Sequence, residues 1–552
     1  MRRQQVLSQH VPSYAERKRK IEGEPLSPNV GALLDAAVSG HEDRPALHFF
    51  EEPEGPVTYR ELRDRVNQLA NGLLERGVTR GTHVGVMLPN VVQFPITWLA
   101  LARIGAAMVP INPAYTHREL SYVLEDGDVA FLIIHRDSLA AWFDIPASSR
   151  RLARERIYVV DAEGDEFESW DSLSVGQSVD APDIDGPSID AVLNLQYTSG
   201  TTGFPKACLL THRYWLTTSK QNAFRDGRAY ERILASTPFF YMDPQWQMLM
   251  AFHRHGCLYV ARRQSASRFM QWVRQFRIDF ALFPEVVLKQ PPSPLDGEHE
   301  LVRVNVYGLS KDNHALLEER FDVCAREAYG MTEVGTALFV PLEATDRIGS
   351  GSCGVPVPFR EVRIVDEKGV VLGPDQVGEL QVRGPGLMLG YYNKPEATAN
   401  AFRDGWFRTG DLFRRDDAGY YYIVGRIKDM IRRAGENIAA HEVESVLLAF
   451  PEVAETAVVP VKDDIRGEEV KAYVVPQAGI DPHSMLHPLI EHCTRNLAPF
   501  KVPRYLEFRT SLPKTASGKI SKTDLIAGAE DLREGSYDRV KGDWISHTAS
   551  GQ

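Results

Sequence analysis

Residues 197–207 read Tyr-Thr-Ser-Gly-Thr-Thr-Gly-Phe-Pro-Lys-Ala, and this stretch says more about the chain than any other. Small hydroxyl residues alternate with glycines, so backbone amides can approach an anion closely while the hydroxyls donate to it. Lys206 adds a positive charge. Such a loop suits a polyphosphate, although it lacks the G-x-x-x-x-G-K-[ST] spacing of a Walker A loop. The alternative is a plain surface turn, which only the rest of the sequence can exclude.

The composition is that of an ordinary globular protein, with 43% hydrophobic and 25% charged residues among 552. A net charge of −11 argues against broad nucleic-acid binding, because phosphate contacts need clustered Lys and Arg. Five scattered cysteines without C-x-x-C spacing indicate a reducing compartment and no zinc site. The best membrane candidate, Phe94 to Ala102, is far shorter than the roughly twenty residues of a spanning helix. We expect a cytoplasmic protein without an integral membrane segment.

Alternating apolar patterns predict an α/β fold. Residues 58–77 place leucines and a valine at helical spacing, and residues 84–89 follow as a buried strand. A strand at 191–196 delivers the opening loop. Short antiparallel strands are predicted at 361–384, which indicates a β-rich subdomain. After Gly425 the pattern predicts a compact α+β unit.

Four further motifs follow the opening loop. They are Tyr-Gly-Met-Thr-Glu at 329–333, Trp-Phe-Arg-Thr-Gly-Asp-Leu at 406–412, Gly-Arg-Ile-Lys-Asp-Met-Ile-Arg-Arg-Ala-Gly-Glu-Asn at 425–437 and Pro-Lys-Thr-Ala-Ser-Gly-Lys-Ile at 513–520. In this order the five motifs resemble the adenylate-forming superfamily of acyl-CoA synthetases, peptide-synthetase adenylation domains and luciferases. The resemblance covers roughly residues 30 to 525.

The resemblance implies that the chain binds ATP with Mg²⁺. The residues that match ATP- or AMP-binding positions are Thr198, Ser199, Gly200, Thr201, Thr202, Gly203, Lys206, Tyr329, Gly330, Thr332, Asp411 and Arg426. Among them, Tyr329 is expected to pack on adenine, while Asp411 and Arg426 hold the ribose hydroxyls. Thr201 and Glu333 are expected at the magnesium ion, which requires oxygen ligands. The alternative for Glu333 is a solvated carboxylate at a helix end.

Catalytic roles are implied for Thr198, Glu333 and Lys519. Lys519 matches the lysine that bridges the acyl carboxylate and the α-phosphate, where a cation lowers the repulsion between two anions. Lys428 matches a hinge, about which the small domain rotates after adenylation. Gly435 matches the position that leaves room for the pantetheine arm of CoA. The implied reaction therefore forms an acyl-adenylate and pyrophosphate, and then an acyl-CoA thioester and AMP.

The acid itself is left open by the motifs. Residues 464–473 and 500–507 look like those of the crotonobetaine/carnitine-CoA ligase type, and fatty-acid-CoA ligases are similar too. Tyr241, Asp243 and Trp246 are expected in the acyl pocket, with Tyr241 standing where many relatives carry His. Asp243 between the aromatics could hold a quaternary ammonium group. Alternatively Asp243 caps a helix beside an apolar pocket, and a fatty, aromatic or polycyclic acid is then admissible.

Two departures from the family pattern bear on the site. Ala207 stands where relatives carry Gly, which adds a methyl group to the loop but removes no ligand. Residues 306–310 read Val-Tyr-Gly-Leu-Ser where relatives show a Gly-Ala-rich strand end beside adenine.

Other functions remain open at this stage. The chain could load a separate carrier protein instead of CoA, or act as a luciferase-like oxygenase. A non-catalytic adenylate sensor is disfavoured because both Lys519 and Glu333 are present. The sequence also leaves open whether the chain forms a homodimer.

The predicted fold has a large N-terminal domain of α/β subdomains with a β-rich subdomain, and a small mobile α+β C-terminal domain. We place an N-terminal extension at 1–29, the large domain at 30–427, the small domain at 428–530 and a polar tail at 531–552. The last twenty residues are expected to fray.

Overall fold

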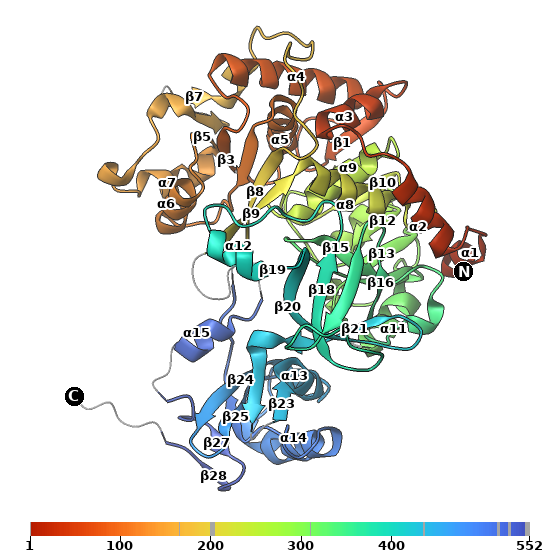
Figure 1. The fold of residues 1–552 in the computed structure, drawn as a ribbon, viewed down its shortest axis with the longest axis vertical. Coiled ribbons are helices and arrows are strands. Elements are labelled where there is room, and N and C mark those ends of the chain that lie inside the picture. Colours follow the sequence, from red (N-terminus) through yellow and green to blue (C-terminus); the bar gives the residue numbers. More distant parts are fainter. Residues whose placement is uncertain are drawn as a thin grey trace. The chain divides into compact units, whose positions relative to one another are not determined.

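The structure is a computed structural model that describes residues 2–164, 166–198, 205–309, 311–433, 436–515, 519–527 and 531–546. Packing divides the chain into two compact units (Figure 1). Unit 1 comprises Met1–Val362 with Val382–Phe407, and unit 2 comprises Arg363–Gln381 with Arg408–Gln552. The predicted boundary between residues 427 and 428 stays a prediction.

The first sheet of unit 1 has seven strands. Their order is β7 (Glu168–Ser169), β6 (Ile157–Val160), β5 (Phe131–His135), β3 (His83–Met87), β4 (Ala107–Pro110), β8 (Val192–Thr198) and β9 (Lys206–Thr211). Neighbours are parallel except β8 and β9, which form an antiparallel hairpin. The hairpin therefore ends the sheet at one edge, with the opening loop between its two strands.

The second sheet of unit 1 is parallel at its centre and antiparallel at both ends. Its order within unit 1 is β16 (Ser352–Pro356), β15 (Gly335–Phe339), β14 (Cys324–Met331), β13 (Arg303–Val306), β12 (Phe280–Leu282), β10 (Arg232–Ala235), β11 (Cys257–Val260), β1 (Pro45–Phe49) and β2 (Val57–Thr58). The strands from β14 to β1 are parallel. The predicted α/β class is confirmed by these two sheets and their helices.

The helices of unit 1 cover and connect the sheets. After the N-terminal pair they are α3 (Val30–Val38), α4 (Tyr59–Glu75), α5 (Gln93–Ile104), α6 (His117–Asp126), α7 (Leu139–Phe143), α8 (His212–Phe224), α9 (Met242–Phe252), α10 (Phe269–Gln275), α11 (Lys311–Phe321) and α12 (Pro395–Ala401). α4 forms where the apolar spacing predicted it, and Leu62, Val66 and Leu69 are fully buried. Thr58 and Glu61 close its first turn as a capping box.

The N-terminal extension is helical and docked, which composition alone did not predict. α1 (Arg2–Ser8) and α2 (Tyr14–Gly23) precede the first motif. Arg17 is 5% exposed and donates through Nε to the Arg225 carbonyl at 2.7 Å and through Nη2 to Glu343 at 2.7 Å. A buried guanidinium is stable only with such partners, so basic residues here serve packing.

Unit 2 contains most of the predicted β-rich segment, and it contains the predicted α+β unit. The first is the strand order β17 (Glu361–Val365), β18 (Gly378–Arg383), β20 (Trp406–Arg415) and β21 (Tyr421–Arg426). The second is built from β22 (Met430–Arg433), β23 (Glu436–Ala439), β24 (Val453–Asp463), β25 (Gly467–Pro476), β26 (Tyr505–Phe508), α13 (Ala440–Leu448), α14 (Pro482–Asn496) and α15 (Lys522–Ala527). Val443, Leu447 and Leu489 of the two longer helices share its apolar core.

The prediction that the last twenty residues fray is wrong as far as residue 546. β27 (Tyr537–Asp538) and β28 (Asp543–Trp544) extend the sheet beyond β26. Asp538 is 1% exposed and pairs with Arg504 at 3.3 Å, and the buried Lys471 donates to the Leu532 carbonyl. The segment is polar because it pairs with buried charges, and composition does not distinguish that from solvation.

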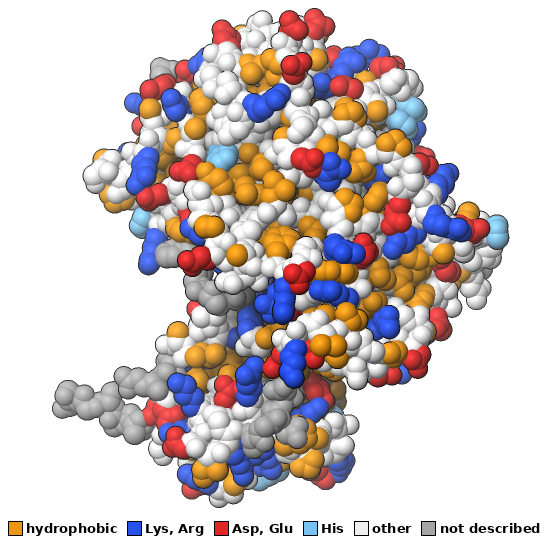
Figure 2. Space-filling view, in the orientation of Figure 1, with side chains coloured by type: hydrophobic (Ala, Val, Ile, Leu, Met, Phe, Trp, Pro, Cys, Tyr) orange, Lys and Arg blue, Asp and Glu red, His pale blue; other side chains and the backbone are white. Residues whose placement is uncertain are grey.

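The surface of unit 1 carries both signs of charge. Figure 2 shows acidic and basic side chains interspersed over its visible face. Among the described residues, none of the helices has both the length and the apolar character needed to cross a bilayer.

Candidate functional site

The opening motif begins at the end of β8 and continues into β9, and these two strands pair as an antiparallel hairpin. Thr198 and Lys206 face each other in the register of the two strands, and the Thr198 hydroxyl donates to the Lys206 carbonyl at 3.4 Å. Several residues predicted to bind phosphate or metal lie between them in the sequence and outside the described residues: Ser199, Gly200, Thr201, Thr202 and Gly203. The sequence predicted the strand before the loop but not the returning strand, whose apolar Ala207–Leu210 was the available signal.

Glu333 lies at the turn between β14 and β15 and is 7% exposed. Its Oε1 accepts a hydrogen bond from the Tyr391 hydroxyl at 2.9 Å. The Lys206 ammonium lies over the Tyr391 ring, 5.0 Å from its centroid. We call these three side chains the Tyr391 cluster. Because Glu333 is buried and sits at a strand turn, the alternative of a solvated helix-end carboxylate is wrong.

Sequence reasoning missed Tyr391. Residues 389–392 run beside β9: the Tyr392 amide donates to the Ala207 carbonyl and the Leu209 amide to the Gly390 carbonyl, both at 2.9 Å. Burial raises the pKa of Tyr391 far above its usual range, and the Glu333 carboxylate raises it further. The phenol therefore stays protonated and donates to Glu333. No local pattern marks a residue brought beside Lys206 from so far along the chain.

Tyr329 and Gly330, which the motif implied for ATP or AMP binding, lie on β14. Tyr329 is 9% exposed. A Cβ at Gly330 would stand 2.5 Å from the Gly335 carbonyl oxygen, so the antiparallel strand leaves no room for a side chain. Thr332, half-buried, follows in the turn that carries Glu333.

Glu327, on the same strand, fixes the segment that departs from the family pattern. Its carboxylate accepts the Gly308 amide at 2.9 Å and the Leu309 amide at 3.0 Å. Burial raises the pKa of Glu327 to about 7, although the two amides act against the rise. The carboxylate thus holds the loop after β13 in one position.

This raised pKa predicts a pH-dependent stability. An unfolded glutamate has a pKa of about 4.3. The contribution of Glu327 is therefore full below about pH 4 and is lost as the pH rises through about 7. We expect the free energy of unfolding of wild type to fall relative to that of Glu327→Gln between about pH 4 and pH 7, by up to about 1.4 kcal/mol per pH unit, and to level off above pH 7. Urea titrations across this range measure it, and parallel curves for the two proteins would contradict it.

Asp411 and Arg426 form a pair in unit 2. They face each other in the register of β20 and β21, and Arg426 Nε lies 2.9 Å from Asp411 Oδ1. The Asp411 side chain is 4% exposed and that of Arg426 is 47% exposed. The arginine therefore orients a nearly buried carboxylate while keeping an open face of its own.

Lys428 and Lys519 also belong to unit 2. Lys428 lies in the short 3-10 helix η7 (Ile427–Asp429), where burial lowers the pKa of its ammonium. Lys519 is exposed, and its carbonyl accepts the Thr515 amide at 2.7 Å. A bridge between Lys514 and Ile520 closes the same turn. Gly435, predicted at the CoA face, lies outside the described residues.

The predicted acyl-pocket residues begin α9. Trp246 is 4% exposed and donates its indole N–H to Asp243 at 3.0 Å. Asp243 lies in the first turn of the helix, whereas Tyr241 occupies the cap position without a side-chain cap bond, so the prediction that Asp243 caps a helix is wrong. Tyr307 is 53% exposed, and its pKa is raised by burial and then by the negative charge of Asp243.

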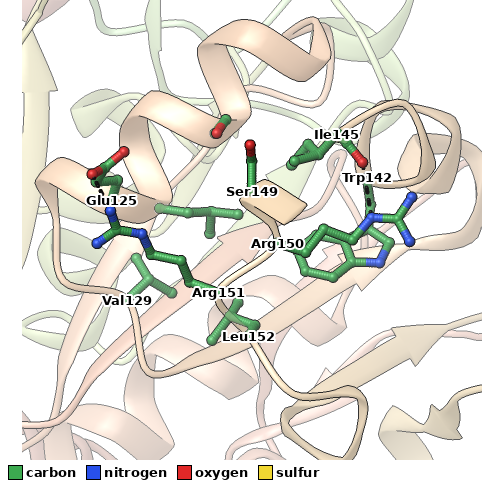
Figure 3. A pocket seen from close by; sticks show the side chains of 10 residues that line it. Glu125, Val129, Trp142, Ile145, Ser149, Arg150, Arg151 and Leu152 are labelled. Carbon is green, nitrogen blue, oxygen red and sulfur yellow. Dashed lines mark hydrogen bonds and ion pairs between the residues drawn. The ribbon is translucent and has the colours of Figure 1, made fainter. Parts of the chain in front are cut away.

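A separate small hollow lies in unit 1 (Figure 3). Its lining, which includes Trp142, Arg150 and Arg151, shares no residue with the Tyr391 cluster. Arg150 Nε donates to the Ile145 carbonyl at 2.9 Å, and Arg151 pairs with Glu125 at 2.5 Å. Both cations are thus engaged by the protein itself.

Two family models match the chain. The model described as AMP-binding enzyme matches residues 34–392, and the one described as AMP-binding enzyme C-terminal domain matches residues 442–519. The crotonobetaine/carnitine–CoA ligase of Salmonella paratyphi C (strain RKS4594) is 31% identical over 527 residues, which covers 90% of this chain and 98% of that ligase.

Solved structures share the fold. ATP-bound MatB from Rhodopseudomonas palustris has a TM-score of 0.81 and 26% identity, and the similarity covers 92% of this chain and 100% of MatB. The anthranilate CoA ligase AuaEII in complex with anthranoyl-AMP has a TM-score of 0.82 and 24% identity, covering 92% of this chain and 98% of that enzyme. The fold class expected from the motifs is confirmed.

Proposed function

Because this chain belongs to the AMP-binding enzyme family, we propose that it is an ATP-dependent acid–CoA ligase. It forms an acyl-adenylate and pyrophosphate, and then an acyl-CoA thioester and AMP. The observation that carries the proposal is the Tyr391 cluster, which joins a cation and a buried carboxylate at the start of β9. The name of the ligase relative favours CoA over a carrier protein as the acceptor.

The cluster fits magnesium and a polyphosphate. Glu333 offers carboxylate oxygens, the ligand type that Mg²⁺ takes, and Lys206 offers an ammonium to the phosphates. When bound, the ion neutralises phosphate charge. Lys206 binds and orients the β- and γ-phosphates, while the Tyr391 hydroxyl keeps Glu333 turned toward them. Thr198 stands opposite Lys206 in the hairpin and donates to the same anion.

Asp411, Arg426 and Lys519 belong to unit 2, and we propose for them the roles that the family resemblance implies. Asp411, oriented by Arg426, accepts the ribose hydroxyls. Lys519, exposed at the end of its turn, donates to the acyl carboxylate and the α-phosphate, so that charge developing during transfer meets a cation. No proton has to be removed in this step.

The products test the reaction class. Purified protein is incubated with ATP, Mg²⁺ and a panel of acids, with and without CoA. We expect acid-dependent pyrophosphate in both cases, and AMP with one thioester per AMP only when CoA is present. ADP with phosphate as products, or thioester formed only on an added carrier protein, would contradict the proposal.

For the acid we propose a betaine-type substrate. Two features support it: the ligase relative named for crotonobetaine and carnitine, and a half-buried Asp243 whose charge acts on the half-exposed Tyr307. A carboxylate beside an aromatic face attracts a quaternary ammonium group by charge and by cation–π interaction. Trp246 does not provide that face, because it is buried and bonded to Asp243.

The Asp243→Asn variant is expected to lose catalytic efficiency selectively. The matched substrates are 4-(trimethylammonio)butyrate and 5,5-dimethylhexanoate. The branch point is a positively charged nitrogen in the first acid and a neutral carbon in the second. We expect kcat/KM to fall about tenfold or more for the cation and about twofold or less for the neutral acid. Equal losses for both acids would end the betaine proposal and favour an apolar acyl group.

A further inference from the structure

We propose that Tyr391 is a positioning residue that sets the metal-binding carboxylate and the phosphate-binding ammonium in one fixed arrangement. The inference rests on the proposed function, since it takes Glu333 as the magnesium ligand and Lys206 as the phosphate ligand. It concerns how these two opposite charges are held, a role that no motif in the sequence indicates.

The hydroxyl of Tyr391 fixes Glu333. It donates to Glu333 Oε1 at 2.9 Å, and Glu333 is only 7% exposed. A buried carboxylate requires donors, and a hydrogen bond to a charged group is stronger than one between neutral groups. The Met388 amide donates to the Glu333 backbone carbonyl at 2.9 Å. The same short segment therefore holds both the side chain and the main chain of Glu333.

The ring of Tyr391 fixes Lys206. The ammonium lies 5.0 Å from the ring centroid, within the roughly 6 Å reach of a cation–π contact. Such a contact orients the lysine without occupying it with a competing carboxylate. The hydroxyl and the ring face thus act on different charges, so that substitutions can separate the two effects.

The backbone of Tyr391 is itself immobilised. It forms a bridge with Cys208 on β9, and its amide donates to the Thr398 hydroxyl at 2.9 Å. The neighbouring residues are bonded to β9 as well. The Tyr392 amide donates to the β9 backbone, and the Gly390 carbonyl accepts from it, both at 2.9 Å. The strand that ends the hairpin therefore positions the tyrosine, and the tyrosine positions both charges.

The test is ATP affinity as a function of Mg²⁺, measured by calorimetry on the full chain without any acid. For Tyr391→Phe we expect a rise of about tenfold in the Mg²⁺ concentration that gives half of the maximal ATP association constant. The reason is that one hydrogen bond to the Glu333 carboxylate is lost. At saturating Mg²⁺ its ATP affinity should stay within about twofold of wild type, because the ring remains under Lys206. Tyr391→Leu should weaken ATP binding at saturating Mg²⁺ as well.

Tyr392→Phe is the matched control. Tyr392 is the adjacent residue on the same segment, but its hydroxyl donates to Asp128 at 2.8 Å, away from the cluster. We expect its Mg²⁺ dependence to match wild type. Circular dichroism and thermal unfolding establish whether each variant is folded. If Tyr391→Leu does not fold, the test rests on the conservative Tyr391→Phe variant.

The outcomes separate the two proposals. A Tyr391→Phe variant with the Mg²⁺ dependence of wild type, or one that shifts no more than Tyr392→Phe, would overturn the positioning role and leave the ligase proposal intact. A wild-type protein that binds no ATP in the presence of Mg²⁺ would overturn the proposed function itself.

Discussion

Replacing Lys519 by alanine is expected to slow acyl-adenylate formation by about 10²–10³, the usual scale of one lost electrostatic contact to a transition state. The acid and the α-phosphate are both anions, so their approach is opposed until a cation lies between them. Alanine removes that cation and nothing else that holds the turn. The Thr515 amide bonds to the backbone of residue 519, and the side chain is exposed.

Single-turnover pyrophosphate release measures the loss. Lys514→Ala is the control, because Lys514 belongs to the same turn but pairs with Glu455 at 2.6 Å on the surface. We expect this control to retain wild-type rates. If Lys519→Ala releases pyrophosphate as fast as Lys514→Ala, Lys519 is not the bridging cation.

The Lys428→Pro variant is expected to form the acyl-adenylate at nearly the wild-type rate and to lose thioester formation. Lys428 lies in a 3-10 turn, whose φ near −60° is compatible with proline. Proline can therefore adopt the 3-10 conformation at residue 428. Its ring prevents the large change in φ at this residue that a hinge requires. The two half-reactions should separate for that reason.

Lys428→Ala provides the comparison, since it removes the ammonium and leaves the backbone free. We expect it to retain both half-reactions. Adenylate formation is followed by pyrophosphate release without CoA, and thioester formation by adding CoA to the preformed adenylate. Equal loss of both half-reactions in Lys428→Pro would refute the hinge role.

Local patterns predicted the elements of the fold well. The 3.6-residue spacing of Leu62, Val66 and Leu69 gave α4, and the apolar run at 84–89 gave β3, because these patterns record which face is buried. The motif order gave the family, which the comparisons confirm. The site residues themselves stay predictions, although the structure pairs Asp411 with Arg426 as neighbours on adjacent strands.

Long-range contacts account for what sequence reasoning missed. Tyr391 acquires its place only when residues 389–392 align with β9, and Arg17 only when α2 docks on the end of α8. Asp538 looked solvated until its partner Arg504 was known. In each case the partners of a polar residue lie far away in sequence, so that local patterns do not record them.

The central claim is that this chain activates a carboxylic acid with ATP. Acid-dependent exchange of labelled pyrophosphate into ATP, measured without CoA, tests it most directly, because only a reversible adenylation step produces that exchange. We expect exchange with at least one acid of a panel that includes 4-(trimethylammonio)butyrate and 5,5-dimethylhexanoate, and its loss in Lys519→Ala. Exchange that proceeds equally without any acid, or equally in Lys519→Ala, would contradict it.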